Sequence, residues 1–431
     1  MILDNYFQEL NSNSKEKRLN ALREIKKLID SGKIKRNPCH GSANNHIHTT
    51  YSFSPYSPTC AVFETWRAGL DTCGIIDHDG IGGCREFYEA GKIINMPVTC
   101  GLECRVKTDN TRLFGRMINN TDQKSIAYVV MHAIPLNALD KVDEVFKPLR
   151  EKRNERNVRM CEKFNEFLSQ FDISISYQED VLPLSNFDCG GVVTERHICL
   201  ALVKKLISIL KDSKEIISFL VDKLVIPVTK VEERRILEEN PNYYEYDILC
   251  VLKKNIVDRF YIDADEECIH IKDFVRLTKK IGCISAYAYL GDVIDTSDGD
   301  KKNQRFEDSY LGILMQELKS LEFDAITYMP SRNTRYQLEK VMGYCKKYSF
   351  FEINGEDINS PRQSFLNCLD NDSMFDHLKE QTYALIGHEI AVTNSLEMAI
   401  FSPTFKKKYP SITDRINYYK EIAKKELKIW E

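Results

Sequence analysis

The sequence lacks several features that would place a protein in a class at once. No uninterrupted apolar run approaches the ~20 residues that a membrane-spanning helix needs. Acids and amides fill the first stretch, MILDNYFQELNSNSKEKR, where a signal peptide would have an apolar core, so no export signal is expected. The net charge is only -4 over 431 residues. Long nucleic acid and a basic membrane-binding surface are therefore not expected as partners.

Cysteines are present, but they do not form a recognisable framework. The chain has 14 of them, and none belongs to a Cys-x-x-Cys pair, so a zinc site built from thiolates has no support. Thiols scattered through a long chain without an export signal are typical of small buried residues in a reducing compartment. We therefore expect a cytoplasmic protein without disulfides. The oligomeric state is left open.

Short apolar runs typical of strands alternate with helical patterns in two parts of the chain, and this predicts βα units with a mainly parallel sheet. A long charged helix (145–171) and a mostly helical stretch (197–260) interrupt the alternation. The predicted organisation is a helical N-terminal extension at 1–38, a first sheet-forming part at 39–196, a helical insertion at 197–262, a second sheet-forming part at 263–400 and a helical tail at 401–431.

Side chains that bind metals follow four of the apolar strand candidates. They are His46 and His48 in NNHIHTT, Asp77 and His78 in GIIDHD, Glu103 in TCGLEC, and Asp357 in NGEDIN. Alternate residues of a strand point to one face, so the His-x-His pair directs two imidazoles into the same volume. In a β/α barrel the carboxyl ends of the strands meet at one mouth. Two neutral imidazoles and two carboxylates suit zinc, manganese or iron.

Each of these groups has a plainer interpretation when it is taken alone. An isolated His-x-His pair more often binds nothing, Asp77 could cap the next helix, and Asp357 could belong to a turn. A lone carboxylate such as Glu103 is more often solvated or paired with a cation. Their shared position at the ends of strand candidates favours the metal site.

The segments NNHIHTTYS, GIIDHDGIGGCREFYEAGK and GLECRV together resemble the first three motifs of PHP-domain phosphoesterases, the polymerase and histidinol phosphatase superfamily. REKRNERNVRMCEKFN is similar to an Arg-rich helix that many members carry. The resemblance covers about 39–210 and, more weakly, 265–360. It implies an α/β fold, a distorted (β/α)7 barrel with up to three divalent metals at its mouth. It also implies hydrolysis of phosphate esters by a metal-activated water.

The resemblance implies a set of site residues. The ligands of the first metal would be His46, His48, Glu103 and Asp357, with His78 and His132 as further ligands. Asp77 and His78 would be the catalytic candidates, completing the mouth as a ligand, as a residue that supports a ligand or as a proton carrier. In the strand before His132, the alternative is that Tyr128 stands where the family has a histidine. One or two ions of manganese, zinc or iron are expected.

Three positions depart from the family pattern. Phe53 stands where members usually have Asp or His, and a phenyl ring cannot bind a metal. Tyr287 falls where many have a histidine, and Asn359 replaces the imidazole of a closing Asp-x-His. The first metal site is therefore complete, the second is open and the third is mostly lost. His388 is interpreted as a structural histidine.

A small phosphorylated metabolite or nucleotide is the expected substrate, and His197, Arg332 and Arg362 are the candidate phosphate-binding residues, since a guanidinium offers two donors to one phosphate. Surface arginines that bind loop carbonyls are an equally good interpretation. Two functions remain: a metal-dependent phosphoesterase, or a degenerate barrel that binds a phosphorylated ligand or a protein with little catalysis. A nuclease module is disfavoured because no polymerase-like sequence accompanies the motifs.

Overall fold

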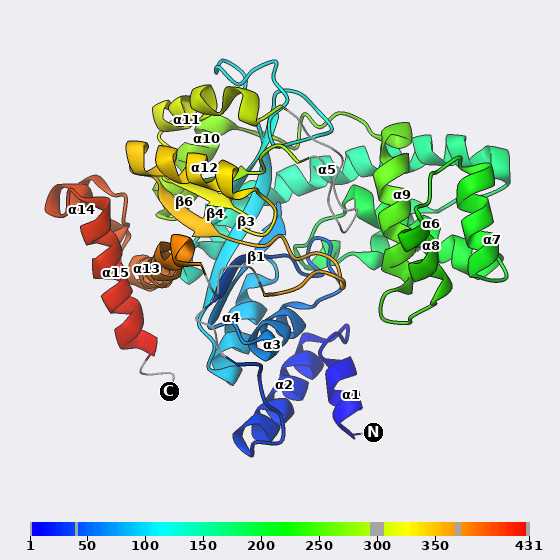
Figure 1. The fold of residues 1–431 in the computed structure, drawn as a ribbon, viewed down its shortest axis with the longest axis horizontal. Helices are drawn as coiled ribbons and strands as arrows, with labels where there is room; N and C mark the ends of the chain where they lie inside the picture. Colours follow the sequence, from blue (N-terminus) through cyan, green and yellow to red (C-terminus); the bar gives the residue numbers. More distant parts are fainter. Residues whose placement is uncertain (1, 39–41, 294–305, 367–371, 428–431) are drawn as a thin grey trace.

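The computed structural model of the protein describes residues 2–38, 42–293, 306–366 and 372–427, and its centre is a strongly curved sheet (Figure 1). Seven strands follow in the order β1-β2-β3-β4-β6-β7-β8, and a short β5 pairs with β3. The strands are β1 (Ala43–Ile47), β2 (Thr72–His78), β3 (Val98–Lys107), β4 (Ile126–His132), β5 (Ile269–His270), β6 (Ile284–Tyr289), β7 (Ala325–Tyr328) and β8 (Phe351–Asn354). The chain after β8 reaches β1 through a bridge between Ile358 and Ile47, which nearly closes a barrel.

The predicted fold class, a distorted (β/α)7 barrel with a helical insertion and helical regions at both ends, is confirmed. One expectation about the sheet needs correction, because β4 runs antiparallel to both of its neighbours, β3 and β6. Parallel strands need a long crossover, usually a helix, whereas the described connection from β3 to β4 (108–125) contains no helix. The carboxyl end of β4 therefore lies at the opposite end of the barrel from those of the parallel strands.

Helices surround the barrel. Those of the βα units are α3 (Pro58–Ala68), α4 (Cys84–Ile94), α10 (Ile271–Ile281), α11 (Leu311–Ser320) and α12 (Arg335–Tyr348). Their start signals are local: Ser57 caps α3 ahead of a proline in its first turn, and Thr334 forms a capping box with Gln337 on α12. Each packs its apolar side on the outer face of the sheet in one continuous core.

The two ends of the chain add helices to this barrel. At the N-terminus are α1 (Ile2–Glu9) and α2 (Lys15–Asp30), and α2 packs on α4 with a buried ion pair between Arg18 and Glu86. At the C-terminus are α13 (Asp376–Asn394), α14 (Pro403–Lys408) and α15 (Ile412–Leu427). Residue 39, where the first barrel segment is predicted to begin, and 428–431 of the predicted tail lie outside the described residues. The other predicted boundaries stay predictions.

Helix α13 covers one end of the barrel. The Glu389 carboxylate accepts the backbone N–H of Cys100 near the start of β3, and the Gln381 side-chain oxygen accepts that of Glu352 near the start of β8. Apolar residues of α13 join the inward-facing side chains of the strands in a second core. The amino ends of the parallel strands are thus covered, and the mouth lies at their carboxyl ends.

The remaining helices form a separate block beside the barrel, on the right in Figure 1. They are α5 (Leu139–Leu168), α6 (Glu195–Ile209), α7 (Ser213–Ser218), α8 (Lys230–Leu237) and α9 (Tyr244–Phe260). Their shared core draws on residues from Met160 to Phe260, together with one barrel residue, Phe53. This helical block begins within the second half of α5. Along the whole described chain, no helix is both long and apolar enough to cross a bilayer.

Tyr287 does not stand at the mouth. It pairs with Val129 on the outer face of the sheet, whereas its neighbour Ala286 pairs with the inward-facing Val130. Its hydroxyl donates to Glu307 Oε1 at 2.5 Å, and Glu307 Oε2 accepts the N–H of Gly291 at 2.7 Å. Burial raises the pKa of Glu307 to about 7, although these hydrogen bonds lower it. The tyrosine therefore fixes the chain after β6 from outside the barrel.

Replacing Glu307 with Gln is expected to change how stability depends on pH. The native glutamate keeps its proton up to about pH 7, whereas the unfolded chain loses it near the ordinary value of 4.5. Ionisation of this glutamate in the unfolded chain therefore lowers the unfolding free energy as pH rises from 4.5 to 7, by roughly 3 kcal/mol at most. Urea unfolding at pH 5 and pH 7.5 should show this fall in the native protein and a smaller one in Glu307→Gln. Equal falls in both proteins would contradict the assignment.

Candidate metal centre

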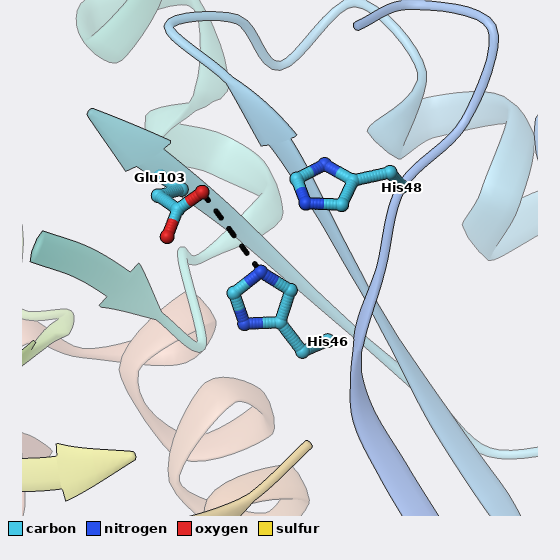
Figure 2. A group of neighbouring side chains, drawn as sticks. All are labelled: His46, His48 and Glu103. Carbon is cyan, nitrogen blue, oxygen red and sulfur yellow. Dashed lines mark ion pairs between the residues drawn. The ribbon is translucent and has the colours of Figure 1, made fainter. Parts of the chain in front are cut away.

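Three side chains converge just inside the mouth. His46 lies on β1, His48 follows that strand directly, and Glu103 lies on β3 (Figure 2). One ligand atom from each lies within 4.8 Å of the others, and all three residues are buried. His46 Nε2 is 4.0 Å from Glu103 Oε2, the contact drawn as a dashed line in Figure 2. The predicted His-x-His geometry is therefore present, with a carboxylate opposite the two imidazoles.

Two further predicted residues lie against this cluster. His78 Nδ1, at the end of β2, is 3.1 Å from Glu103 Oε2, and Asp357 Oδ1, after β8, is 3.1 Å from His48 Nε2. Two atoms bound to one metal at about 2.1 Å each lie about 3.0–3.4 Å apart in octahedral or tetrahedral geometry. These separations, and a donor set of imidazole nitrogens and carboxylate oxygens, fit a divalent transition metal.

The protonation of the two histidines differs. Burial, followed by the positive charges of His48, Arg153 and Arg196, holds the pKa of His78 well below its usual range, so its imidazole is neutral and can bind a metal. Burial also acts to lower the pKa of His48, but the hydrogen bond and charge of Asp357 outweigh it and raise the pKa. Asp357 and His48 thus attract a positive charge between them.

Gly355 allows the chain after β8 to pass close to His46. A Cβ at this position would lie 2.4 Å from the His46 Cβ and 3.0 Å from its backbone nitrogen, closer than packed atoms can approach. Asn44 holds the same crossing together, because its side chain accepts the N–H of Glu356 and donates to the carbonyl oxygen of that residue. These contacts bring Asp357 within reach of the histidines.

Asp77 faces away from the mouth, since it alternates with His78 on β2. Its carboxylate accepts the backbone N–H of Thr49 at 2.7 Å, the Thr49 hydroxyl at 2.6 Å and the Ser52 hydroxyl at 2.6 Å. These bonds hold the loop that follows His48. The sequence grouped Asp77 with His78 because the two are adjacent, but the strand directs them to opposite faces.

His132 lies deeper in the barrel than the cluster. On β4 it pairs with Ile284 at the start of β6, whereas Val130 pairs with Glu103. The reversed strand therefore carries His132 two residues, or about 7 Å, further from the mouth. Burial, with a smaller effect of the His46 charge, lowers its pKa to about 3. Tyr128 occupies the mouth on this strand, with its ring centroid 5.8 Å from that of His78. This placement matches the alternative that the sequence left open.

The three predicted phosphate-binding residues have other contacts. His197 Nδ1 accepts the N–H of Thr194 at 2.9 Å in the cap of α6, and Arg332 Nε donates to the carbonyl oxygen of Leu290 at 3.3 Å. Arg362 forms a two-pronged ion pair with the buried Asp247 of α9. None of the three is among the described residues that line the mouth pocket. These contacts place the three side chains outside the described lining of the pocket, and their role in binding phosphate stays a prediction.

The pocket above the cluster has a volume of about 210 Å³. The barrel contributes His46, His78, Glu103 and Asp357 together with Arg105 and Tyr128, and the helical block contributes the opposite wall. Its cationic lining residues are Arg105, Arg153, Arg196, Lys253 and Lys254. Sequence reasoning missed all five as ligand-binding residues. A partial signal was available, because Arg150, Arg153 and Arg156 recur every third residue and so lie along one side of α5.

Buried ion pairs join the two walls. Glu195, at the start of α6, accepts from Arg105 at 2.9 Å, from Arg156 at 2.9 Å and from Arg153 at 3.3 Å. Arg153 also pairs with Asp79 at 2.5 Å, just after β2. The opposing charges of the three arginines hold the pKa of Glu195 well below its usual range, against the effect of burial. The helical block is thus connected to the barrel by charge at the pocket.

The departures from the family pattern have structural roles. Phe53 packs edge-on against His197, with ring centroids 4.9 Å apart, and joins the core of the helical block. Asn359 donates from Nδ2 to Asp357 Oδ1 at 2.7 Å and so orients that carboxylate. His388 lies on α13 at the closed end of the barrel, and burial lowers its pKa to about 3. The structural interpretation of His388 agrees with this position.

Replacing Gly355 with Ala is expected to push His46 away from Glu103 and to weaken metal binding. Gly343→Ala is the matched control, because a Cβ there would meet nothing within 4 Å. Isothermal titration with Mn²⁺ should show an affinity reduced about tenfold or more in Gly355→Ala and unchanged in Gly343→Ala, as expected when ligands lose their orientation. Equal affinity in the two variants would contradict the role of this close approach.

Comparison with known proteins gives matches in fold only. No family model matches the chain, and no curated protein matches it. A crystal structure of an inferred metal-dependent phosphoesterase from Bifidobacterium adolescentis has a TM-score of 0.50 and 17% identity, over 77% of this chain and 92% of that one. An amidohydrolase from Chromobacterium violaceum, with bound sulfate and no metal, has a TM-score of 0.49 and 15% identity, over 74% and 88%. The first match supports the barrel fold that the resemblance to PHP-domain proteins implies.

Proposed function

We propose that this protein is a metal-dependent hydrolase of phosphate esters that acts on a small phosphorylated metabolite or nucleotide. One observation carries the proposal: a buried set of metal-ligating side chains shares a pocket of about 210 Å³ with five cationic residues. Ligands for a metal and cations for a phosphate are the two requirements of metal-assisted phosphate-ester hydrolysis. The volume suits a small molecule.

His46, His48, Glu103 and Asp357 would hold the principal metal, and His78 would hold a second or complete the first site. One or two ions of manganese, zinc or iron per chain are expected. A divalent cation here supplies positive charge to the phosphate oxygens and lowers the pKa of water. Water replaces the ester oxygen at phosphorus, so the P–O ester bond breaks and an alcohol and phosphate leave.

Arg196 is the proposed phosphate-binding residue in place of His197, Arg332 and Arg362, and Arg105 and Arg153, which pair with Glu195 and Asp79, add positive charge beside it. Arg105 lies two residues beyond Glu103 on the same face of β3, and the charges of Arg153 and Arg196 are felt by His78. Guanidinium groups so close to the ligands can bind the same phosphate that a metal binds. Lys253 and Lys254 face the more distant part of the substrate.

If no metal ion binds His78, its neutral imidazole, which lines the pocket, is the proposed group for moving a proton at the mouth. Asp77 is not suited to that role, because its oxygens are occupied by Thr49 and Ser52. The 12 cysteines in the described part of the chain carry free thiols, which agrees with a reducing cytoplasm as the proposed location.

Removing a ligand is expected to abolish both metal binding and hydrolysis. Protein purified without chelator or affinity tag should contain one or two equivalents of manganese, zinc or iron by elemental analysis. His46→Ala should lose this metal and at least about 100-fold of kcat/KM on a panel of phosphate monoesters, because the metal activates water and binds phosphate. His388→Ala is the control histidine and should keep its metal. A native protein that contains no metal, even after incubation with these metal ions, would contradict the proposal.

The proposed phosphate-binding Arg196 differs from Arg362 in a measurable way. Arg196→Ala should raise KM about tenfold or more on the best substrate, because a charge-assisted contact to phosphate is lost. Arg362→Ala should leave KM unchanged and reduce the unfolding free energy, because it leaves Asp247 buried without its partner. Steady-state kinetics measures KM, and urea unfolding measures the unfolding free energy, for both variants. A rise in KM for Arg362→Ala alone would reverse the assignment.

A second candidate is a degenerate barrel that binds a phosphorylated ligand or a protein with little catalysis. The observation in its favour is that the mouth ends of β4 and β6 offer Tyr128 and Ala288 to the pocket, neither of which is an imidazole. Under this candidate, His46→Ala would keep ligand binding, and the native protein would show no turnover with any phosphate ester. Binding of inorganic phosphate, measured by calorimetry alongside turnover, separates the two candidates.

A further inference from the structure

Ser52 links the candidate metal centre to Asp77. Its Oγ lies 2.6 Å from Asp77 Oδ1 and 3.2 Å from His48 Nδ1. All three residues are buried, with exposures of 0% for Ser52, 1% for Asp77 and 2% for His48. Water therefore does not compete for these contacts, and their direction follows from the donors and acceptors that the three side chains possess.

Asp77 determines which atoms donate and which accept in the contacts that link Asp77, Ser52 and His48. Its Oδ1 already accepts the backbone N–H of Thr49 at 2.7 Å, so this oxygen acts as an acceptor toward Ser52 as well. A serine hydroxyl has a single proton, and the short contact to a carboxylate takes it. Toward His48 the hydroxyl oxygen can then only accept. The proton of the neutral His48 imidazole must therefore be on Nδ1.

A proton on Nδ1 leaves the lone pair of Nε2 pointing into the cluster. There it faces Asp357 Oδ1 at 3.1 Å, so two electron-rich atoms point toward the same space. A cation between them, either a second proton on Nε2 or a metal ion, removes the repulsion. A histidine binds a metal through its unprotonated nitrogen, and the partner of its other nitrogen selects which one that is.

We infer that Asp77 and Ser52 are positioning residues for the metal centre: Asp77, acting through Ser52, holds His48 as the Nδ1–H tautomer and presents Nε2 to the metal. This inference rests on the proposed metal site and deepens it. It gives Asp77 a role separate from ligation and from proton transfer to a substrate.

Nitrogen-15 NMR of histidine-labelled, metal-free protein at pH 9 tests the tautomer directly. In the native protein the His48 proton is expected on Nδ1. In Ser52→Ala it should move to Nε2, where it can donate to Asp357. Ser54→Ala is the matched control, because this serine is buried on the same loop but accepts from the backbone N–H of Tyr56. A native His48 with its proton on Nε2 would overturn the inference.

Zinc affinity, measured by competition with a chelator, is the second test. Ser52→Ala should weaken Zn²⁺ binding about tenfold or more, as expected for loss of a partner that orients a ligand, and Ser54→Ala should change it less than about twofold. Equal affinities in the two variants would also overturn the inference. If the native protein binds no metal, the proposed function fails, and the NMR result still decides the tautomer. If Ser52→Ala does not fold, the tautomer of His48 in the native protein, measured by NMR, still decides the inference.

Discussion

The site depends on the closure of the barrel between β1 and the chain after β8. Strand β1 carries His46 and leads directly into His48, and the returning chain carries Asp357. Their meeting requires a residue without a Cβ at Gly355 and an amide at Asn44 that bonds both backbone polar groups of Glu356. A buried backbone polar group without a partner costs about 1–3 kcal/mol, so Asn44 stabilises the crossing as well as aligning it.

The helical block gives the pocket a positively charged wall. The barrel supplies carboxylates and imidazoles, whereas α5, α6 and α9 supply cations. The two halves are held together by Phe53, which packs in the core of the block, and by Glu195, which three arginines surround. Phe53 stands where the PHP-domain proteins that the sequence resembles usually have Asp or His. In this chain the position makes an apolar contact between the two halves.

Much of the centre was predictable because its signals are local. The His-x-His pair, Glu103 and Asp357 each end an apolar run, and the alternation of a strand decides which side chains share a face. Tyr287 and Asp77 were misplaced for the same reason: without a sheet register, odd and even positions cannot be assigned to faces. The reversal of β4 could have been noticed from the absence of a helical pattern between β3 and β4, which would have moved His132 away from the mouth. The cationic wall was harder to predict, since Glu195 meets Arg105 across 90 residues.

The order in which the chain is synthesised determines when the barrel can close. His46 and His48 leave the ribosome early, whereas Asp357 follows some 300 residues later, after the whole helical block. Domains of this size fold through partly formed states that expose apolar surface. A metal at the proposed site would have its full ligand set only in the closed barrel, so its binding energy would favour that structure over any chain that ends before Asp357. The ion would thus stabilise the protein only after the chain beyond β8 has returned to β1 and the barrel has closed.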